Sequence, residues 1–221
     1  PRAILDAGAL TARRTAAASA LASRYLSRPD SKTLLIIGTG RVARQLIAAH
    51  CSVRPIDEVR VWGRNSMHAE DVADEASRET GVRCVCIPDV ETGASGADII
   101  SSATSSESPL LQGGWVGSGT HVDLVGAYKP TMCEADADLI GKADQVFVDT
   151  VEGAKDEAGD LIQAVQAGTF SFDEIAGDMY RMSSGDASLR IDSNEITLFK
   201  SVGSALQDLA AAQLCATGHR P

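Results

Sequence analysis

Two glycines and a small residue follow an apolar segment, 33–37, at a spacing suited to nucleotide binding. Gly38 permits a tight turn, Gly40 lets the main chain approach a pyrophosphate, and Ala43 lets the next helix pack close to the preceding strand. Free N–H groups at the start of that helix would bind the pyrophosphate. The spacing predicts a dinucleotide site that includes Gly38, Thr39, Gly40, Arg41 and Val42.

The segment after the second expected strand, 59–62, bears on the choice of cofactor. Sites selective for NAD carry an acidic residue about 20 residues beyond the glycines, which binds the ribose 2′-hydroxyl. This chain has Arg64, Asn65 and Ser66 there instead. Arg64 can pair with a 2′-phosphate, and its two neighbours can add hydrogen bonds. The segment favours NADPH, with NADH as the alternative cofactor and a solvated arginine as the alternative interpretation of Arg64.

Composition and charge exclude several classes of protein. The 221 residues are enough to bury a substantial core, and the formal net charge of −10 argues against general binding to nucleic acid or to an anionic membrane. The sequence contains no run of 18 apolar residues and no signal-peptide pattern at its start.

The cysteines indicate neither a disulfide framework nor a metal site. They are five in number and form no CxxC pair, and only four histidines accompany them. Cys84 and Cys86 alternate with Val85 in an expected strand, which predicts buried, reduced thiols. We therefore expect no metal and a reducing, cytoplasmic location.

Hydrophobic periodicity predicts alternating strands and helices. Strands separated by helical crossovers form a parallel sheet covered on both faces, so the expected fold is α/β, a Rossmann-type, doubly wound and mostly parallel sheet with flanking helices. A polar stretch with little periodicity, 170–194, is expected to be loop. The expected strands are 33–37, 59–62, 82–86, 98–103, 121–125 and 145–148, and the expected helices are 10–26, 42–50, 67–80, 160–168 and 202–214.

Five motifs, in order over nearly the whole chain, resemble those of the ornithine cyclodeaminase and mu-crystallin family. They occupy residues 10–17, 38–43, 125–130, 157–160 and 195–203. The last motif is the most specific, because unrelated Rossmann proteins have no reason to carry it. The family contains cyclodeaminases, alanine dehydrogenases, reductases of cyclic imino acids, opine-type synthases and a thyroid-hormone-binding crystallin.

The resemblance implies a two-domain subunit that forms a homodimer. Its N-terminal domain for substrate binding and dimerisation is expected to lie outside this chain. Residues 1–30 would form a helix linked to that domain, 31–198 the dinucleotide-binding domain, and 199–221 a C-terminal helix that returns toward the first domain.

The resemblance also implies roles for individual residues. Arg14 takes the place of the family arginine that binds the substrate carboxylate, for which a guanidinium fork is well suited. Arg13 is about 100° round the helix and would point elsewhere. Lys200 is expected near the substrate. The alternative interpretation of Arg14 is a solvated helix arginine, and that of Ser201 is a helix cap. Further cofactor contacts are expected from Thr15, Ala103, Thr104, Val125, Gly126, Ser201 and Gly203.

One departure from the family pattern bears on the reaction. Cyclodeaminases of the family carry a catalytic aspartate where this chain has Tyr128. A phenol has a pKa of about 10 and is a poor substitute for a carboxylate base at neutral pH. The segment indicates an NADPH-dependent oxidoreductase acting on a small imino or amino acid, such as pyrroline-2-carboxylate reduced to proline. A cyclodeaminase with bound NAD and a cofactor-dependent ligand-binding protein of the crystallin type are the alternatives.

Reduction of an imine needs hydride at carbon and a proton at nitrogen. Three residues near expected strand ends could supply the proton: Asp123 first, then Tyr128 and Lys129. A structural role is the alternative for each of them.

Overall fold

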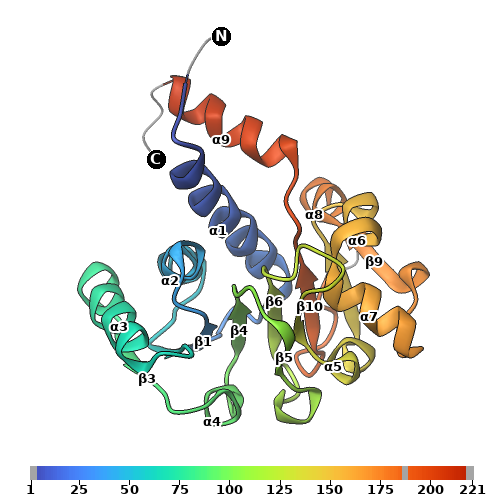
Figure 1. The fold of residues 1–221 in the computed structure, drawn as a ribbon, viewed down its shortest axis with the longest axis horizontal. Helices are drawn as coiled ribbons and strands as arrows, with labels where there is room; N and C mark the ends of the chain where they lie inside the picture. The colour runs from blue at the N-terminus through green and yellow to red at the C-terminus, as the bar shows by residue number, and fades with distance from the viewer. Residues whose placement is uncertain (1–3, 186–188, 218–221) are drawn as a thin grey trace.

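The computed structural model describes residues 4–185 and 189–217, and its centre is a parallel sheet (Figure 1). The strand order is β3-β2-β1-β4-β6-β10-β8-β9, and every pairing within this sheet is parallel. The predicted Rossmann-type architecture is therefore confirmed. The strands are β1 (Thr33–Ile37), β2 (Glu58–Trp62), β3 (Arg83–Cys86), β4 (Ile99–Ser102), β6 (His121–Leu124), β8 (Gln145–Val148), β9 (Ile175–Asp178) and β10 (Thr197–Lys200).

Helices cover both faces of the sheet because the buried strands are apolar on both sides. Leu34 and Ile36 of β1 pack under α1, α2 and α3, while Leu35 and Ile37 pack with α4 to α7 on the other face. The helices are α1 (Ala7–Leu26), α2 (Arg41–Val53), α3 (Ser66–Thr80), α4 (Val90–Ala94), α5 (Ala137–Lys142), α6 (Val151–Glu157), α7 (Gly159–Ala167), α8 (Met179–Ser184) and α9 (Ala205–Thr217).

Helix α1 crosses the sheet and places the motif with Arg14 near the ends of the central strands. It begins at an N-cap, Asp6, whose Oδ1 accepts a hydrogen bond of 2.7 Å from the Ala9 N–H. Alanines such as Ala16 and Ala22 are buried, and their small side chains allow close packing against α2 and the sheet. The helix ends at Leu26, as predicted, and begins three residues before the predicted Leu10.

The prediction of a loop over 170–194 is wrong. Strand β9 and helix α8 both lie in this stretch. β9 has four residues at the edge of the sheet and α8 has six, so neither is long enough to show a clear hydrophobic period.

Strand β10 was not predicted, although it lies between β6 and β8. All four of its residues are buried, including Lys200, so the strand shows no alternation of polar and apolar side chains.

Helix α9 starts at Ala205 instead of Val202, which also excludes Ser201 as its cap. Helices α5 and α6 were not predicted, and neither was the small second sheet formed by β5 (Glu107–Leu111) and β7 (Cys133–Ala135).

The cysteines are free, but two of them are less buried than predicted. Cys84 and Cys86 are half-buried because β3 is an edge strand of the sheet. Among residues 4–185 and 189–217, no group of three or more Cys, His, Asp or Glu side chains could hold a metal ion. In the same ranges, no helix is long and apolar enough to cross a membrane.

Candidate functional site

The turn between β1 and α2 leaves space beside its main chain for a pyrophosphate. Gly38 has a φ of +123°, and a Cβ there would lie 2.6 Å from the Ala103 carbonyl oxygen. A side chain at this position would therefore be strained and would clash. Gly40 is the N-cap of α2, so no side chain caps this end of the helix. A Cβ at Gly40 would meet nothing within 4 Å. This helix end is therefore neither capped by a side chain nor crowded at Gly40, as an anion site requires.

A cavity of about 710 Å³, the glycine-turn pocket, extends from this turn along the ends of β1, β2 and β4. Arg64 and His68 line it, and no carboxylate does so among the described residues. A phosphate in this pocket would meet positive charge without a competing negative one. The lining residues are Gly38, Thr39, Gly40, Trp62, Gly63, Arg64, Asn65, His68, Ala103, Thr104, Ser105, Ser106 and Leu110.

The residues after β2 differ in what they present to the glycine-turn pocket. Arg64 is exposed at its wall, whereas Asn65 is the N-cap of α3 and its Oδ1 accepts from the Met67 N–H at 3.0 Å. Ser66 is the first residue of α3 and lies outside the lining. His68 was not predicted as a site residue, although the helical spacing from Asn65 places it on the same side of α3.

A second cavity of about 280 Å³, the Arg14 pocket, lies beside the glycine-turn pocket. The two share Ala103 and Thr104 in their walls, so one elongated ligand can reach both. Eight residues predicted from the family resemblance, Arg14 among them, meet here with Val42, although they come from distant parts of the chain. The lining residues are Thr11, Arg14, Thr15, Val42, Ala103, Thr104, Val125, Gly126, Tyr128, Ser201, Val202 and Gly203.

Arg14 reaches this pocket from α1 and is held by polar groups of α9. Its Nε donates to Asp208 Oδ1 at 2.9 Å, and Nη1 donates to Gln207 Oε1 at 2.9 Å. The Arg14 side chain is 14% exposed. Its guanidinium therefore already binds a carboxylate in this structure, the kind of group for which its fork of donors is suited.

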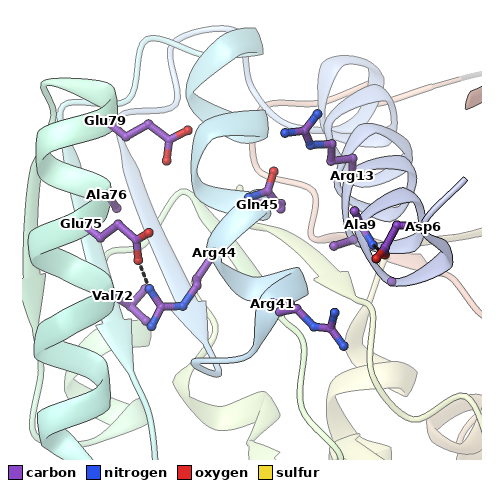
Figure 2. A pocket seen from close by; sticks show the side chains of 12 residues that line it. Asp6, Ala9, Arg13, Arg41, Arg44, Gln45, Val72, Glu75, Ala76 and Glu79 are labelled. Atoms are coloured by element: carbon purple, nitrogen blue, oxygen red, sulfur yellow. Dashed lines mark hydrogen bonds and ion pairs between the residues drawn. The ribbon is translucent and has the colours of Figure 1, made fainter. Parts of the chain in front are cut away.

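Arg13 points away from the Arg14 pocket, as predicted from the helical angle. Figure 2 shows it at a separate groove between α1, α2 and α3, where Arg44 pairs with Glu75. Arg41 also lines this groove, and a Cβ on Gly8 would lie 2.6 Å from its Nη1. The prediction that Arg41 binds the cofactor is therefore not supported for its side chain. Its main-chain N–H remains in the first turn of α2.

Asp123, the first candidate for proton transfer, lies inside the protein. The residue is 0% exposed and lines neither pocket. Its carboxylate accepts hydrogen bonds from Ser19 Oγ at 3.1 Å and Ser101 Oγ at 2.5 Å, and His50 Nε2 lies 3.4 Å away. Because these groups surround the carboxylate, Asp123 cannot contact a ligand in either pocket, and the predicted role is not supported. Burial also lowers the pKa of the neighbouring His121 to about 3.

Lys200, predicted to bind the substrate, is also 0% exposed and lines neither pocket. Its ammonium group lies 3.0 Å from Asp160 Oδ2 and donates to the Gly126 carbonyl. The predicted direct contact between Lys200 and the substrate is therefore not supported, because the side chain ends behind the wall of the Arg14 pocket.

Tyr128 is the one proton-transfer candidate that lines the Arg14 pocket. It is 48% exposed, and Lys129 Nζ lies 6.0 Å from the centre of its ring. The preceding Ala127 is buried and has a φ of +49°, which is uncommon for a residue with a side chain. Such strained positions are frequent at functional sites, and this one directs the Tyr128 segment toward the pocket.

The Rossmann-type sheet and the glycine turn have the form of a dinucleotide-binding domain. The family model described as the ornithine cyclodeaminase/mu-crystallin family matches residues 1–217, and the chain belongs to this family. It is 41% identical to a Delta(1)-pyrroline-2-carboxylate reductase of Colwellia psychrerythraea, over 96% of this chain and 67% of that protein.

Solved structures agree with this membership. The Delta(1)-pyrroline-2-carboxylate reductase of Thermococcus litoralis, in complex with NADH and L-proline, superposes with a TM-score of 0.92 at 35% identity, over 94% of this chain and 64% of that one. An archaeal alanine dehydrogenase dimer with bound NAD gives a TM-score of 0.88 at 29% identity, over 94% and 63% of the two chains. The chain thus spans about two thirds of the length of these relatives.

Proposed function

We propose that this chain is the dinucleotide-binding part of an NADPH-dependent reductase of small cyclic imino acids, such as pyrroline-2-carboxylate, which it reduces to proline. The main support is the shared wall of the two pockets, formed by Ala103 and Thr104. A dinucleotide anchored at Gly40 would reach this wall with its nicotinamide end. A carboxylate bound by Arg14 would lie beside the same two residues in the Arg14 pocket, so that the nicotinamide and the imine could meet there. Relatives named as pyrroline-2-carboxylate reductases support the substrate class.

In this proposal the protein orients the reactants. The nicotinamide cofactor supplies a hydride when bound. Arg14 binds the carboxylate and so fixes the position of the adjacent imine carbon, which provides much of the catalysis by proximity. Val42, Val125 and Val202 give the pocket an apolar lining. The Tyr128 hydroxyl lines this pocket and could donate the proton that the imine nitrogen needs, directly or through an ordered water.

The choice of NADPH rests on charges in the glycine-turn pocket. Arg64 can form charge-assisted hydrogen bonds with a 2′-phosphate, and a protonated His68 would add a second positive charge. A carboxylate that would repel the phosphate is not present among the described residues of the lining. Two solved relatives are named with NADH or NAD, so the preference for NADPH is a proposal for this chain alone.

We also propose a homodimer, because an archaeal alanine dehydrogenase of similar fold is described as a dimer. The cytoplasmic location and the boundaries 1–30, 31–198 and 199–221 stay predictions. The exposed apolar side chains of α9, Leu206, Leu209 and Leu214, suit the predicted return of this helix toward a further domain.

The direct test of the activity uses the longest protein that the gene encodes. We expect pyrroline-2-carboxylate to oxidise NADPH and to yield proline, and ornithine to release no ammonia above background. The control is the same protein without imine. Ammonia and proline formed from ornithine would contradict the proposal and support a cyclodeaminase. Binding of NADPH without turnover of any cyclic imine would support a ligand-binding protein.

A further inference from the structure

Three ionisable side chains are buried directly behind the Arg14 pocket. Lys200 and Glu134 are 0% exposed and Asp160 is 1% exposed, and none of them lines either pocket. Burial of charged groups is unfavourable unless they are paired and hydrogen bonded, and apolar residues of similar volume often give equal or greater stability. The arrangement therefore calls for a reason other than stability.

Lys200 connects this cluster to the floor of the pocket. Its ammonium group donates to the Gly126 carbonyl and pairs with Asp160 Oδ2 at 3.0 Å. Gly126 lines the Arg14 pocket and is closely packed, since a Cβ there would lie 2.5 Å from the Glu134 carboxyl carbon and would overlap the Thr104 carbonyl oxygen. The position of the Gly126 main chain thus depends on the lysine on one side and on Thr104 on the other.

Glu134 connects the same cluster to the wall shared by both pockets. Its Oε1 accepts from Ser102 Oγ at 2.7 Å, from the Thr104 N–H at 2.6 Å and from Thr104 Oγ1 at 2.8 Å. Burial raises the pKa of this carboxyl, against the opposing effect of Lys200. Asp160 joins the two halves, because its Oδ1 accepts from the Glu134 N–H at 2.6 Å and from the Ala135 N–H at 3.0 Å.

We infer that Lys200 is a positioning residue for imine reduction, acting through the Gly126 carbonyl and through Asp160 and Glu134 on Thr104. It sets the distance between the wall that the nicotinamide would contact and the floor on which the imine would lie. This inference rests on the proposed reductase activity. It places Lys200 behind the site and not in contact with the substrate. Small displacements at such a position reduce the rate strongly, because hydride transfer depends on close approach of the reacting atoms.

The test compares Lys200→Met with a control variant at an exposed lysine, Lys142→Met. Lys142 also holds main-chain carbonyls, with Nζ donating to Gly113 O at 2.9 Å and Val116 O at 2.7 Å, but these residues line neither pocket. We expect Lys200→Met to lower kcat by about 100-fold, the loss typical of a displacement near 1 Å. The Kd for NADPH should change little. Lys142→Met should lower only the midpoint of thermal unfolding.

A double variant, Asp160→Asn with Lys200→Met, separates positioning from stability. It removes the unpaired buried charge that the single variant leaves, so the unfolding midpoint should recover. We expect kcat to stay low, because neither new side chain holds the Gly126 carbonyl. Recovery of kcat together with the midpoint would overturn the inference and make Lys200 a purely structural residue.

Amide hydrogen exchange tests the same inference without turnover. In the protein bound to NADPH, Lys200→Met should accelerate exchange at the Thr104 and Gly126 N–H groups, while Lys142→Met should leave both unchanged. Unchanged exchange in Lys200→Met would also overturn the inference. If the unmutated protein reduces no cyclic imine, the proposed function fails, and the exchange result still decides whether Lys200 positions this wall.

Discussion

The glycine-turn pocket and the Arg14 pocket share a wall but are built in different ways. The first is made by segments that follow neighbouring strands β1, β2 and β4 and by main-chain groups near Gly38 and Gly40. The second is made by side chains from α1, from the loop after β6 and from the loop after β10. The ionisable side chains behind the Arg14 pocket, including Lys200, are buried, whereas Arg64 of the glycine-turn pocket is exposed. The proposed cofactor site thus arises from local geometry, while the proposed substrate site needs the whole tertiary structure.

The largest effect is expected from a substitution in the glycine turn, whose main chain lines the glycine-turn pocket. Gly38→Ala should lower the free energy of unfolding by about 2 to 5 kcal/mol, the sum of positive-φ strain and overpacking against Ala103. Urea unfolding would measure this. Gly40→Ala is the matched control, because a Cβ there meets nothing within 4 Å. It should fold normally but bind NADPH poorly, since the new methyl would occupy the approach to the pyrophosphate. Normal NADPH binding by Gly40→Ala would place the pyrophosphate elsewhere.

The second effect concerns the side chains of the Arg14 pocket. Arg14→Ala should lower kcat/KM for pyrroline-2-carboxylate by an amount equivalent to about 3 kcal/mol of activation free energy, because a charge-assisted contact with the carboxylate is lost. We expect KM to rise and kcat to fall together, since the same contact orients the imine carbon. Arg13→Ala is the control and should leave both constants unchanged, as Arg13 lines the separate groove. Equal losses in the two variants would argue for a general effect on α1.

The smallest expected effect is on cofactor preference. Arg64→Ala should weaken NADPH by about 1.5 kcal/mol and leave NADH nearly unaffected, because Arg64 is exposed and its pairing with a 2′-phosphate is screened by solvent. Titration of both cofactors against the variant and the unmutated protein measures the difference, and NADH is the internal control. The same loss for both cofactors would remove Arg64 from the 2′-phosphate site.

The sequence allowed good prediction where one element carries its own signal. The apolar strand 33–37, the turn at Gly38 and the helix after it were all placed close to their observed bounds. Prediction failed for β10, whose residues are buried on both faces, and for β9 and α8, which are too short to show a period. It also failed for the side chains of Asp123 and Lys200, because charged residues are expected at surfaces or in sites, and these two are buried in pairs.

The sequence by itself determined the parallel α/β fold, the glycine turn after β1 and the absence of an acidic residue after β2, because these depend on local conformation and short spacings. Only the tertiary structure decided which side chains meet at the Arg14 pocket. Insertion of β10 between β6 and β8 brings Ser201 and Gly203 to Arg14, which lies far away in the chain. The same insertion buries Lys200 behind Gly126. Such contacts arise from long-range packing, which leaves no period or spacing in the sequence.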